Sequence, residues 1–225
     1  MYMALQSGDL DMVWNYSVGV AGTYQEILAN DDQIALVNVA AANAPAVLAF
    51  NNAKGLFADE NLRKAVSYAL DYSAFQTYFG SAYAEIPNRG FVPATIVGYQ
   101  ETEKLETNLE TAASFMEAAG YTGKNEDGFY VNADGDIASF TLTVNAGKET
   151  QVGYGELIKT QLENFGIQVV LDTLDGDSYN AKTSNKFSEN NITMEAAIYG
   201  YTAAGMGMGG GLASIYVDGT HPVQG

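Results

Sequence analysis

The sequence predicts an α/β protein, and three observations lead to that prediction. Strand-like alternation at Phe140–Val144, an amphipathic stretch at 150–165 that ends at Gly166, and a β-branched run at Ile167–Leu171 follow one another. Two strands joined through a helix form a βαβ unit, in which they run parallel with a right-handed crossover. Hydrophobic residues make up 47% of the 225 positions and charged residues 16%, which is enough for a buried core.

The N-terminal elements are predicted from short patterns. The stretch "DLDMVWNYS" predicts a strand over Asp11–Tyr16 that buries Val13 and places Trp14 and Tyr16 on the opposite side. "AGTYQEILAND" predicts a short helix. The following "QIALVNVAAANAPAVLAFNN" contains two extended runs interrupted near Asn43-Ala44-Pro45, and we expect these runs to pair as β-strands.

The clearest helix pattern begins after Asp59, which has the right chemistry for an N-cap. The apolar residues behind it recur at the spacing of one helix face, and they are Leu62, Ala65, Val66, Ala69 and Leu70. We expect this helix to lie on the sheet.

Two further helices are predicted from capping boxes. Ser73 with Gln76 opens one, and Thr107 with Glu110 opens another that ends at Gly120. Residues 80–100 hold two of the four prolines and show no sustained period, so they predict a long loop of the kind that is usually functional.

The segment "DGFYVNADGDIASFTLTVNAG" predicts a hairpin, with a strand at 128–132 and a turn at Asp134-Gly135. The string "NADGD" in this segment resembles part of a calcium loop, which needs Gly at its sixth position and Glu at its twelfth. Counted from Asn132, those positions hold Ile137 and Thr143, so the hairpin is preferred. Farther on, "GDSYNAKTSNKF" predicts a short helix and "TMEAAIYGY" a strand.

Composition excludes several classes of function. The chain carries 27 acidic and 10 basic residues, a net charge of −17, so we expect no nucleic-acid partner. It has no cysteine, and its one histidine, His221, is expected to be a surface residue near the end of the chain. "GMGMGG" at 205–210 fits a dinucleotide-binding loop only formally, because no second βαβ half can follow it. We expect no cofactor and no metal.

Aromatic residues are the remaining candidates for a binding site, and the chain has 15 Tyr, 10 Phe and one Trp. Trp14, Tyr16, Tyr199 and Tyr201 lie at the ends of predicted strands beside irregular segments, where their rings are candidates for lining a ligand cleft. Arg89, in the long loop, is a candidate partner for a ligand carboxylate.

Several segments in order resemble the extracellular solute-binding proteins of family 5, which are the dipeptide and oligopeptide receptors of ABC importers. "LQSGDLD", "LAFNN" and "LFADENLRKAVSYALDYSAF" carry the resemblance first, and "GFVPAT", "AASFMEAAGY", "FTLTV" and "IKTQLENFGIQVVLDTLDGDSYNAK" extend it from about residue 4 to 200. The positions that match the family's strand end and helix core are Phe50, Asn51, Arg63, Ala65, Tyr68, Ala69 and Asp71.

This resemblance implies a periplasmic-binding-protein-like fold of type II, in which two lobes close on a ligand about a hinge. The chain would be mainly the C-terminal lobe, with a mixed sheet flanked by helices. Residues 1–16 would be the end of the other lobe and a crossover strand, 17–200 the ligand-binding lobe, and 201–225 a glycine-rich return connection. The first residues, "MALQSG", look like the end of a helix, so we expect a fragment of a longer protein.

The function implied is that of a peptide-binding component of an ABC importer. Its partners would be an oligopeptide ligand and the transmembrane permease subunits, at the extracellular face of a bacterial membrane or in the periplasm. A lipid anchor upstream of residue 1 would supply the only membrane association. After Tyr201 the next acid is Asp218, whereas many family members carry an aspartate there that pairs with the ligand's amino terminus. Oligosaccharide or metal-chelate binding therefore stays open.

Two alternatives come from other classes. A carboxylate-dependent hydrolase would use acids such as Asp31 and Asp32. A structural or adhesive domain would have no defined cleft.

Overall fold

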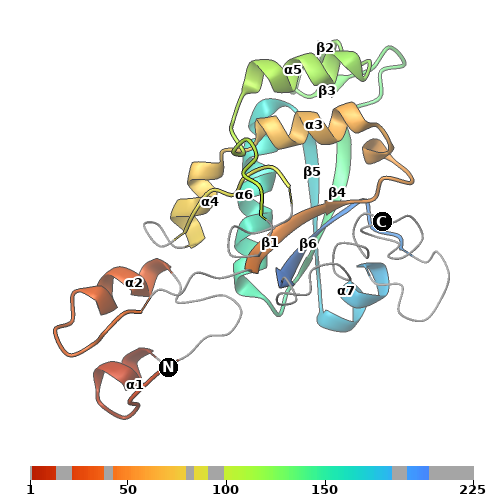
Figure 1. The fold of residues 1–225 in the computed structure, drawn as a ribbon. Coiled ribbons are helices and arrows are strands. Elements are labelled where there is room, and N and C mark those ends of the chain that lie inside the picture. The colour runs from red at the N-terminus through yellow and green to blue at the C-terminus, as the bar shows by residue number, and fades with distance from the viewer. Residues whose placement is uncertain are drawn as a thin grey trace.

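A four-stranded mixed β-sheet forms the centre of the computed structural model (Figure 1). Its strands are β1 (Asn43–Phe50), β4 (Ser139–Asn145), β5 (Gln168–Leu174) and β6 (Ala196–Thr202), in the order β1-β6-β4-β5. The structure describes residues 2–13, 22–37, 43–79, 84–90, 99–183 and 192–202.

The predicted βαβ unit is confirmed. β4 and β5 are parallel along their whole length, and helix α6 (Glu149–Phe165) connects them. Gly166 ends α6 with φ 118°, a left-handed conformation that glycine adopts without steric cost. β6 is parallel to β4 but pairs with it only through Leu142 and Thr143, and β1 runs antiparallel to β6. The sheet is therefore mixed.

Alternate residues of the strands face two separate cores. On one side, Phe140, Leu142 and Val144 are buried against α3 (Glu60–Ala69) and α6. On the other, Ala197 and Tyr199 pack with Tyr179 of α7 (Gly176–Thr183). The period of two along each strand thus assigns α3 and α6 to one face and α7 to the opposite face.

Close packing of α6 on the sheet depends on Gly155. A β-carbon there would lie 2.9 Å from Cδ1 of Leu171 and 3.0 Å from Cγ1 of Val144. Such distances are shorter than van der Waals contact, so a larger residue would push α6 away from the sheet.

The other elements extend this body. A short 3-10 turn, η1 (Leu56–Ala58), leads into α3, and α5 (Leu109–Ala118) packs on α3. β2 (Gly123–Lys124) pairs with β3 (Tyr130–Val131), and α4 (Tyr72–Phe79) contacts α6. In Figure 1, α1 (Tyr2–Gln6) and α2 (Gly22–Ala29) lie apart from the sheet at the lower left, and the rings of Tyr2 and Tyr24 are in contact at 4.7 Å.

The predicted pairing of two neighbouring runs around residues 33–50 is not found among the described residues. Residues 33–37 form no strand, residues 38–42 lie outside the described residues, and β1 pairs with β6. Pro45 lies inside β1 at a point where the register with β6 shifts, between Ala44 and Val47. Proline has no N–H to donate, so it is tolerated at such an irregularity. Asp11–Val13 is also not in a strand, and the rest of that predicted strand lies outside the described residues.

Two predicted caps are displaced by one or two residues. Asp71, not Ser73, caps α4, because its Oδ1 accepts hydrogen bonds from the backbone N–H groups of Ser73 and Ala74. Asn108, not Thr107, caps α5 by accepting from the N–H of Thr111. The predicted N-cap of α3 at Asp59 and the predicted end of α6 at Gly166 are confirmed.

The predicted hairpin is confirmed only at its turn. Oδ1 of Asn132 accepts hydrogen bonds from the N–H groups of Asp134 and Asp136, and a bridge joins Val131 to Ile137. Beyond this bridge the two strands separate, because β3 pairs with β2 and β4 enters the central sheet. The reason is burial: Phe140, Leu142 and Val144 have a larger core available in the central sheet.

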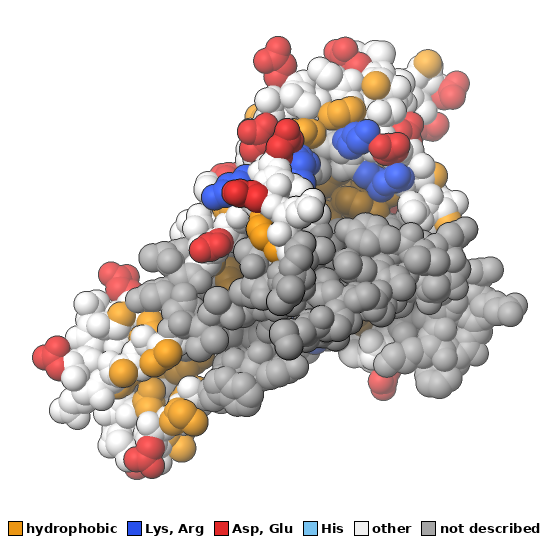
Figure 2. Space-filling model, in the orientation of Figure 1, with side chains coloured by type: hydrophobic (Ala, Val, Ile, Leu, Met, Phe, Trp, Pro, Cys, Tyr) orange, Lys and Arg blue, Asp and Glu red, His pale blue; other side chains and the backbone are white. Residues whose placement is uncertain are grey.

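Charge is unevenly distributed on the face drawn in Figure 2. Acidic side chains lie on the N-terminal helices and also on the upper part of the molecule, whereas the basic ones visible in this view gather in its upper half.

Within the described ranges, no helix combines the length and the apolar character needed to cross a bilayer.

Asn51 joins the end of β1 to the start of β6. Its N–H donates to the carbonyl oxygen of Glu195 (2.8 Å), its Nδ2 donates to that of Met194 (3.0 Å), and its Oδ1 accepts from Ala53 N–H (3.1 Å). The residue is only 8% exposed. Oε2 of Glu195 in turn accepts from the N–H of Thr141 (2.7 Å), which ties β6 to β4.

We predict that Asn51→Ala lowers the free energy of unfolding by about 2 kcal/mol, because it leaves the buried carbonyl of Met194 without its donor. Urea unfolding followed by circular dichroism measures this change. Asn52→Ala is the matched control, since Asn52 is exposed. Equal losses in the two variants would contradict a specific role for Asn51.

Candidate functional site

The ends of the strands bring polar groups together at one edge of the sheet. β4, β5 and β6 are parallel, so their carboxyl ends meet there, and the antiparallel β1 contributes its first residues. We call this the strand-end edge and define it by Asn43, Ala44, Asn145, Leu174, Tyr201 and Thr202. Open α/β sheets bind ligands outside the carboxyl ends of their strands.

The backbone at this edge is arranged by local hydrogen bonds. Oδ1 of Asn145 accepts from the N–H of Gly147, and the N–H of Ala146 donates to the carbonyl of Leu174. These bonds turn the chain directly from β4 into the first turn of α6. Asn145 is half-buried and Gly147 is exposed, so the turn is accessible from outside.

Asp175 makes the corresponding turn after β5. Its Oδ1 accepts from the N–H groups of Asp177 and Ser178, and its Oδ2 accepts from the hydroxyl of Ser178 at 2.7 Å. The hydrogen bond from the Ser178 side chain, aided by the backbone donors, lowers the pKa of the Asp175 carboxyl. Asp175 is therefore a fixed, ionised acceptor beside the strand-end edge at neutral pH.

Tyr199 is the predicted site residue whose side chain is best described in this region. Its hydroxyl donates to the carbonyl of Thr183 at 2.7 Å, and its ring meets that of Tyr179 edge-on at 6.0 Å. The hydroxyl of Tyr179 donates to the carbonyl of Ile198 at 2.6 Å. Burial raises the pKa of Tyr199 to about 12. These contacts attach α7 to β6.

The other predicted site residues are placed unequally. Trp14 and Tyr16 lie outside the described residues. The backbone of Tyr201 lies opposite Ala44 at the strand-end edge, two residues beyond Tyr199 on β6. Arg89 belongs to another part of the fold, beside α3, and none of its described contacts is with β6.

Arg89 lies in a polar and aromatic cluster. Its guanidinium lies 4.3 Å from the centre of the Tyr68 ring, and its NH1 is 3.4 Å from Oγ of Ser67. Its backbone N–H donates to the carbonyl of Glu103, which holds the loop in place. NH2 of Arg89 is buried and has no hydrogen-bond partner among the described residues. The N–H groups of this nitrogen therefore have no described acceptor.

Within the described ranges, no group of three His, Asp or Glu side chains is arranged to hold a metal ion. Oδ1 of Asp31 accepts from the N–H of Gln33, which is an interaction within its own turn.

The sequence matches a profile described as bacterial extracellular solute-binding proteins, family 5 middle, over residues 1–214. The chain belongs to this family. Family 5 consists of solute-binding proteins rather than enzymes, so membership does not support the hydrolase alternative. The family is extracellular, in agreement with the location implied by the sequence.

Individual relatives point to more than one kind of ligand. The oligopeptide-binding protein AppA of Bacillus subtilis is 26% identical over 127 residues, which cover 54% of this chain and 23% of AppA. The solved structure of AppA with a nonapeptide matches with a TM-score of 0.69 and 22% identity, over 89% of this chain and 38% of that one.

Two further solved structures share the fold. NikA of Brucella suis in complex with Fe(III)-EDTA gives a TM-score of 0.75 at 15% identity, covering 99% of this chain and 43% of NikA. MelB of Agrobacterium fabrum C58 in complex with stachyose gives a TM-score of 0.57 at 21% identity, covering 72% of this chain and 27% of MelB. The chain thus spans less than half the length of each relative.

Sequence reasoning missed the polar turns at the strand-end edge and the contacts of Asn51. The signal for Asp175 was available, since Asp-Gly-Asp-Ser after a β-branched run is typical of a strand passing into a capped helix. Asn51 was recognised only through the family resemblance, because its partners Met194 and Glu195 are far away in the sequence.

We predict that Tyr199→Phe lowers the free energy of unfolding by about 1 kcal/mol at neutral pH, because it removes the hydrogen bond to Thr183. In the folded protein, burial favours the neutral phenol and raises its pKa to about 12. In the unfolded chain the pKa of a tyrosine is about 10. The contribution of Tyr199 is therefore complete below pH 10 and is lost as the pH rises toward 12.

Chemical denaturation at several pH values tests this. The difference between the parent and Tyr199→Phe should shrink from pH 10 to 12, whereas Tyr78→Phe, at a side chain that is 44% exposed, should change little at any pH. A difference that stays constant to pH 12 would contradict the assignment.

Proposed function

We propose that the protein is the substrate-binding component of an ABC importer and that it captures peptides in a cleft between two lobes, of which this chain forms mainly one. The match to family 5 over residues 1–214 carries the proposal. The partners would be the transmembrane permease subunits, and a lipid anchor upstream would attach the protein to the outer face of the membrane.

We also propose how the chain divides between the lobes. Residues 1–16 would be the end of the other lobe and the crossover strand, and residues 17–200 the C-terminal ligand-binding lobe. The contact of α2 with α4 supports placing α2 in the C-terminal lobe. Residues 201–225 remain proposed as the glycine-rich return connection.

The strand-end edge suits a peptide ligand on chemical grounds. An extended peptide presents N–H and C=O groups that can pair with exposed backbone, while water fills roomy side-chain pockets. The turns at Asn145 and Asp175 offer accessible polar groups for such pairing. Tyr201, and with it Trp14, Tyr16 and Tyr199, are proposed to line the cleft with aromatic surface.

The alternative ligands are a metal chelate and an oligosaccharide. NikA binds Fe(III)-EDTA and MelB binds stachyose on the same fold. The absence of an acid between Tyr201 and Asp218 in the sequence favours these alternatives, and tyrosine rings are suited to stacking on sugars.

Thermal unfolding of the full-length protein against peptides, oligosaccharides and metal chelates tests the proposal. A ligand at 100 times its dissociation constant adds about 2.7 kcal/mol of stability, so one class should raise the melting temperature clearly. We expect the peptides to do so. A shift with stachyose or a chelate alone would select the alternative, and no shift with any class would contradict a binding function.

Arg89 has a separate prediction. If NH2 of Arg89 binds the ligand's carboxylate, Arg89→Gln should weaken binding of free-acid peptides by about tenfold or more and leave C-terminally amidated peptides unaffected. Calorimetry on both peptide forms measures this. Lys64→Gln, at an exposed position on α3, is the control for loss of one positive charge. Equal weakening of acid and amide would assign Arg89 a structural role.

A further inference from the structure

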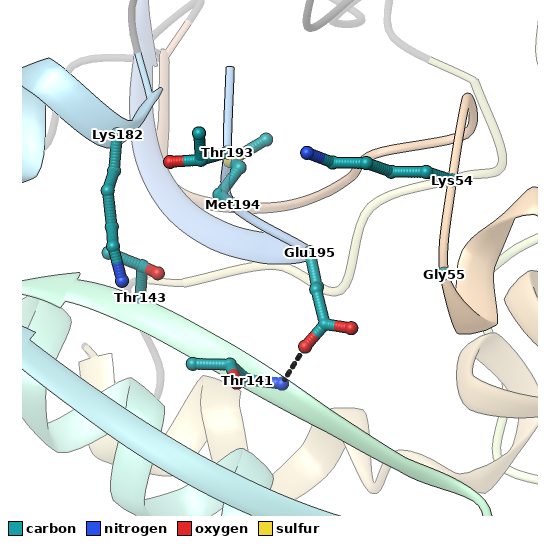
Figure 3. A pocket seen from close by; sticks show the side chains of 8 residues that line it. All are labelled: Lys54, Gly55, Thr141, Thr143, Lys182, Thr193, Met194 and Glu195. Atoms are coloured by element: carbon teal, nitrogen blue, oxygen red, sulfur yellow. Dashed lines mark hydrogen bonds between the residues drawn. The ribbon is translucent and has the colours of Figure 1, made fainter. Parts of the chain in front are cut away.

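A polar pocket lies between β4, the start of β6, α7 and the segment that follows β1 (Figure 3). Its volume is about 330 Å³, and its lining residues are Lys54, Gly55, Thr141, Thr143, Lys182, Thr193, Met194 and Glu195. Along β6, Glu195 precedes Tyr201 by six residues, or about 20 Å at about 3.3 Å per strand residue, whereas on β4 Thr143 precedes Asn145 by only two. The pocket therefore lies at the amino end of β6, and on β4 it adjoins the strand-end edge.

Thr143 gives the first indication that something binds here. It is fully buried, and its Oγ1 has no hydrogen-bond partner within the described part of the chain. It alternates with Leu142 and Val144, whose side chains enter the core on the other face, so the hydroxyl belongs to the pocket side. A buried hydroxyl without a partner is unfavourable unless a ligand or water supplies one.

The charged side chains give the second indication. Of the ion pairs among the described residues, none includes Lys54 or Glu195, although both line the pocket. The N–H of Thr141 holds Oε2 of Glu195 and leaves Oε1 without a described partner, on the side of Gly55. Figure 3 shows Lys54 and Lys182 on opposite sides of the pocket with Glu195 between them.

Lys182 completes the arrangement. Its Nζ donates to Oδ2 of Asp172 at 2.6 Å, which fixes the ammonium group, and two of its three N–H donors remain for other acceptors. The pocket therefore combines one free acceptor, on Glu195, with donors on Lys54, Lys182 and Thr143. A small anion alone would satisfy the donors but would be repelled by the Glu195 carboxylate.

We propose that this pocket binds a small free amino acid in its zwitterionic form. The ligand carboxylate would accept hydrogen bonds from Lys54, Lys182 and Thr143, and its ammonium group would donate to Oε1 of Glu195. The volume lies at the lower end of the range for ligand sites, about 300–1,000 Å³, which suits one amino acid and not a peptide. The proposal does not depend on which solute the interlobe cleft takes.

Calorimetric titration of the full-length protein with L-serine and glycine tests the proposal. N-acetyl-L-serine lacks the ammonium group and L-serinamide lacks the carboxylate, so each should bind at least about tenfold more weakly than L-serine. Sodium acetate should bind no more tightly than these analogues.

Two variants assign the binding to this pocket. Lys54→Met and Thr143→Val should each weaken L-serine binding by about tenfold, and Thr143→Val should leave the melting temperature of the unliganded protein unchanged or higher, since it removes an unpartnered hydroxyl. Lys64→Met, at an exposed lysine on α3, should bind L-serine as the parent does.

Four results would overturn the proposal. These are no heat of binding with either amino acid, binding that both pocket variants leave intact, acetate binding as tightly as L-serine, and a lower melting temperature for unliganded Thr143→Val. The last would show that the hydroxyl is already satisfied, by water or by the protein's own chain.

Discussion

The antiparallel pairing of β1 with β6 is the constraint on which the rest of the structure depends. β6 reaches β4 through only two residue pairs, so the ladder with β1 supplies most of its backbone hydrogen bonds. Asn51 and Glu195 reinforce the place where the three strands meet. Antiparallel pairing with β1 orients β6, and the orientation of β6 determines where the backbone of Tyr199 and Tyr201 lies.

The two ends of β6 have different polar environments. At its carboxyl end, Asn145 and Asp175 hold exposed turns beside the strand-end edge, which fits binding of an extended ligand. At its amino end, the charged groups of Lys54, Lys182 and Glu195 surround a small pocket. The pairing of β6 with β4 lies between these two ends and is limited to Leu142 with Ala196 and Thr143 with Ala197.

Local patterns predicted the elements whose signals are local. The βαβ unit was predicted because burial on one face imposes a visible period on "FTLTV" and on α6, and Gly166 marks the helix end. The pairing of β1 was not predicted, because strand partners depend on contacts between residues far apart in the sequence, such as Asn43 with Thr202, about 160 positions apart. The predicted N-caps were wrong where two polar residues lie close together before a helix. At α4, the backbone N–H groups donate to Asp71 and not to Ser73.

The sequence predicted which types of residue form the candidate site but not where their side chains lie in the fold. Aromatic residues were identified as candidates because they lie at strand ends beside irregular segments, yet Tyr199 attaches α7 to β6, and Arg89 stacks on Tyr68 of α3. Neither contact has a signature in the sequence, because each joins elements that only the tertiary fold brings together. The charged pocket was missed for the same reason, since Lys54, Lys182 and Glu195 come from three separate segments.

Native-state hydrogen exchange of the β1 amides tests most directly the claim that the β1–β6 junction holds the sheet together. If it does, the amides of Val47 and Ala49, which face β6, should exchange with the same opening free energy as those of Leu142 and Val144 of β4, because one cooperative unit contains them all. If these two β1 amides exchange much faster than those of β4, then β1 opens independently and the sheet does not depend on this pairing.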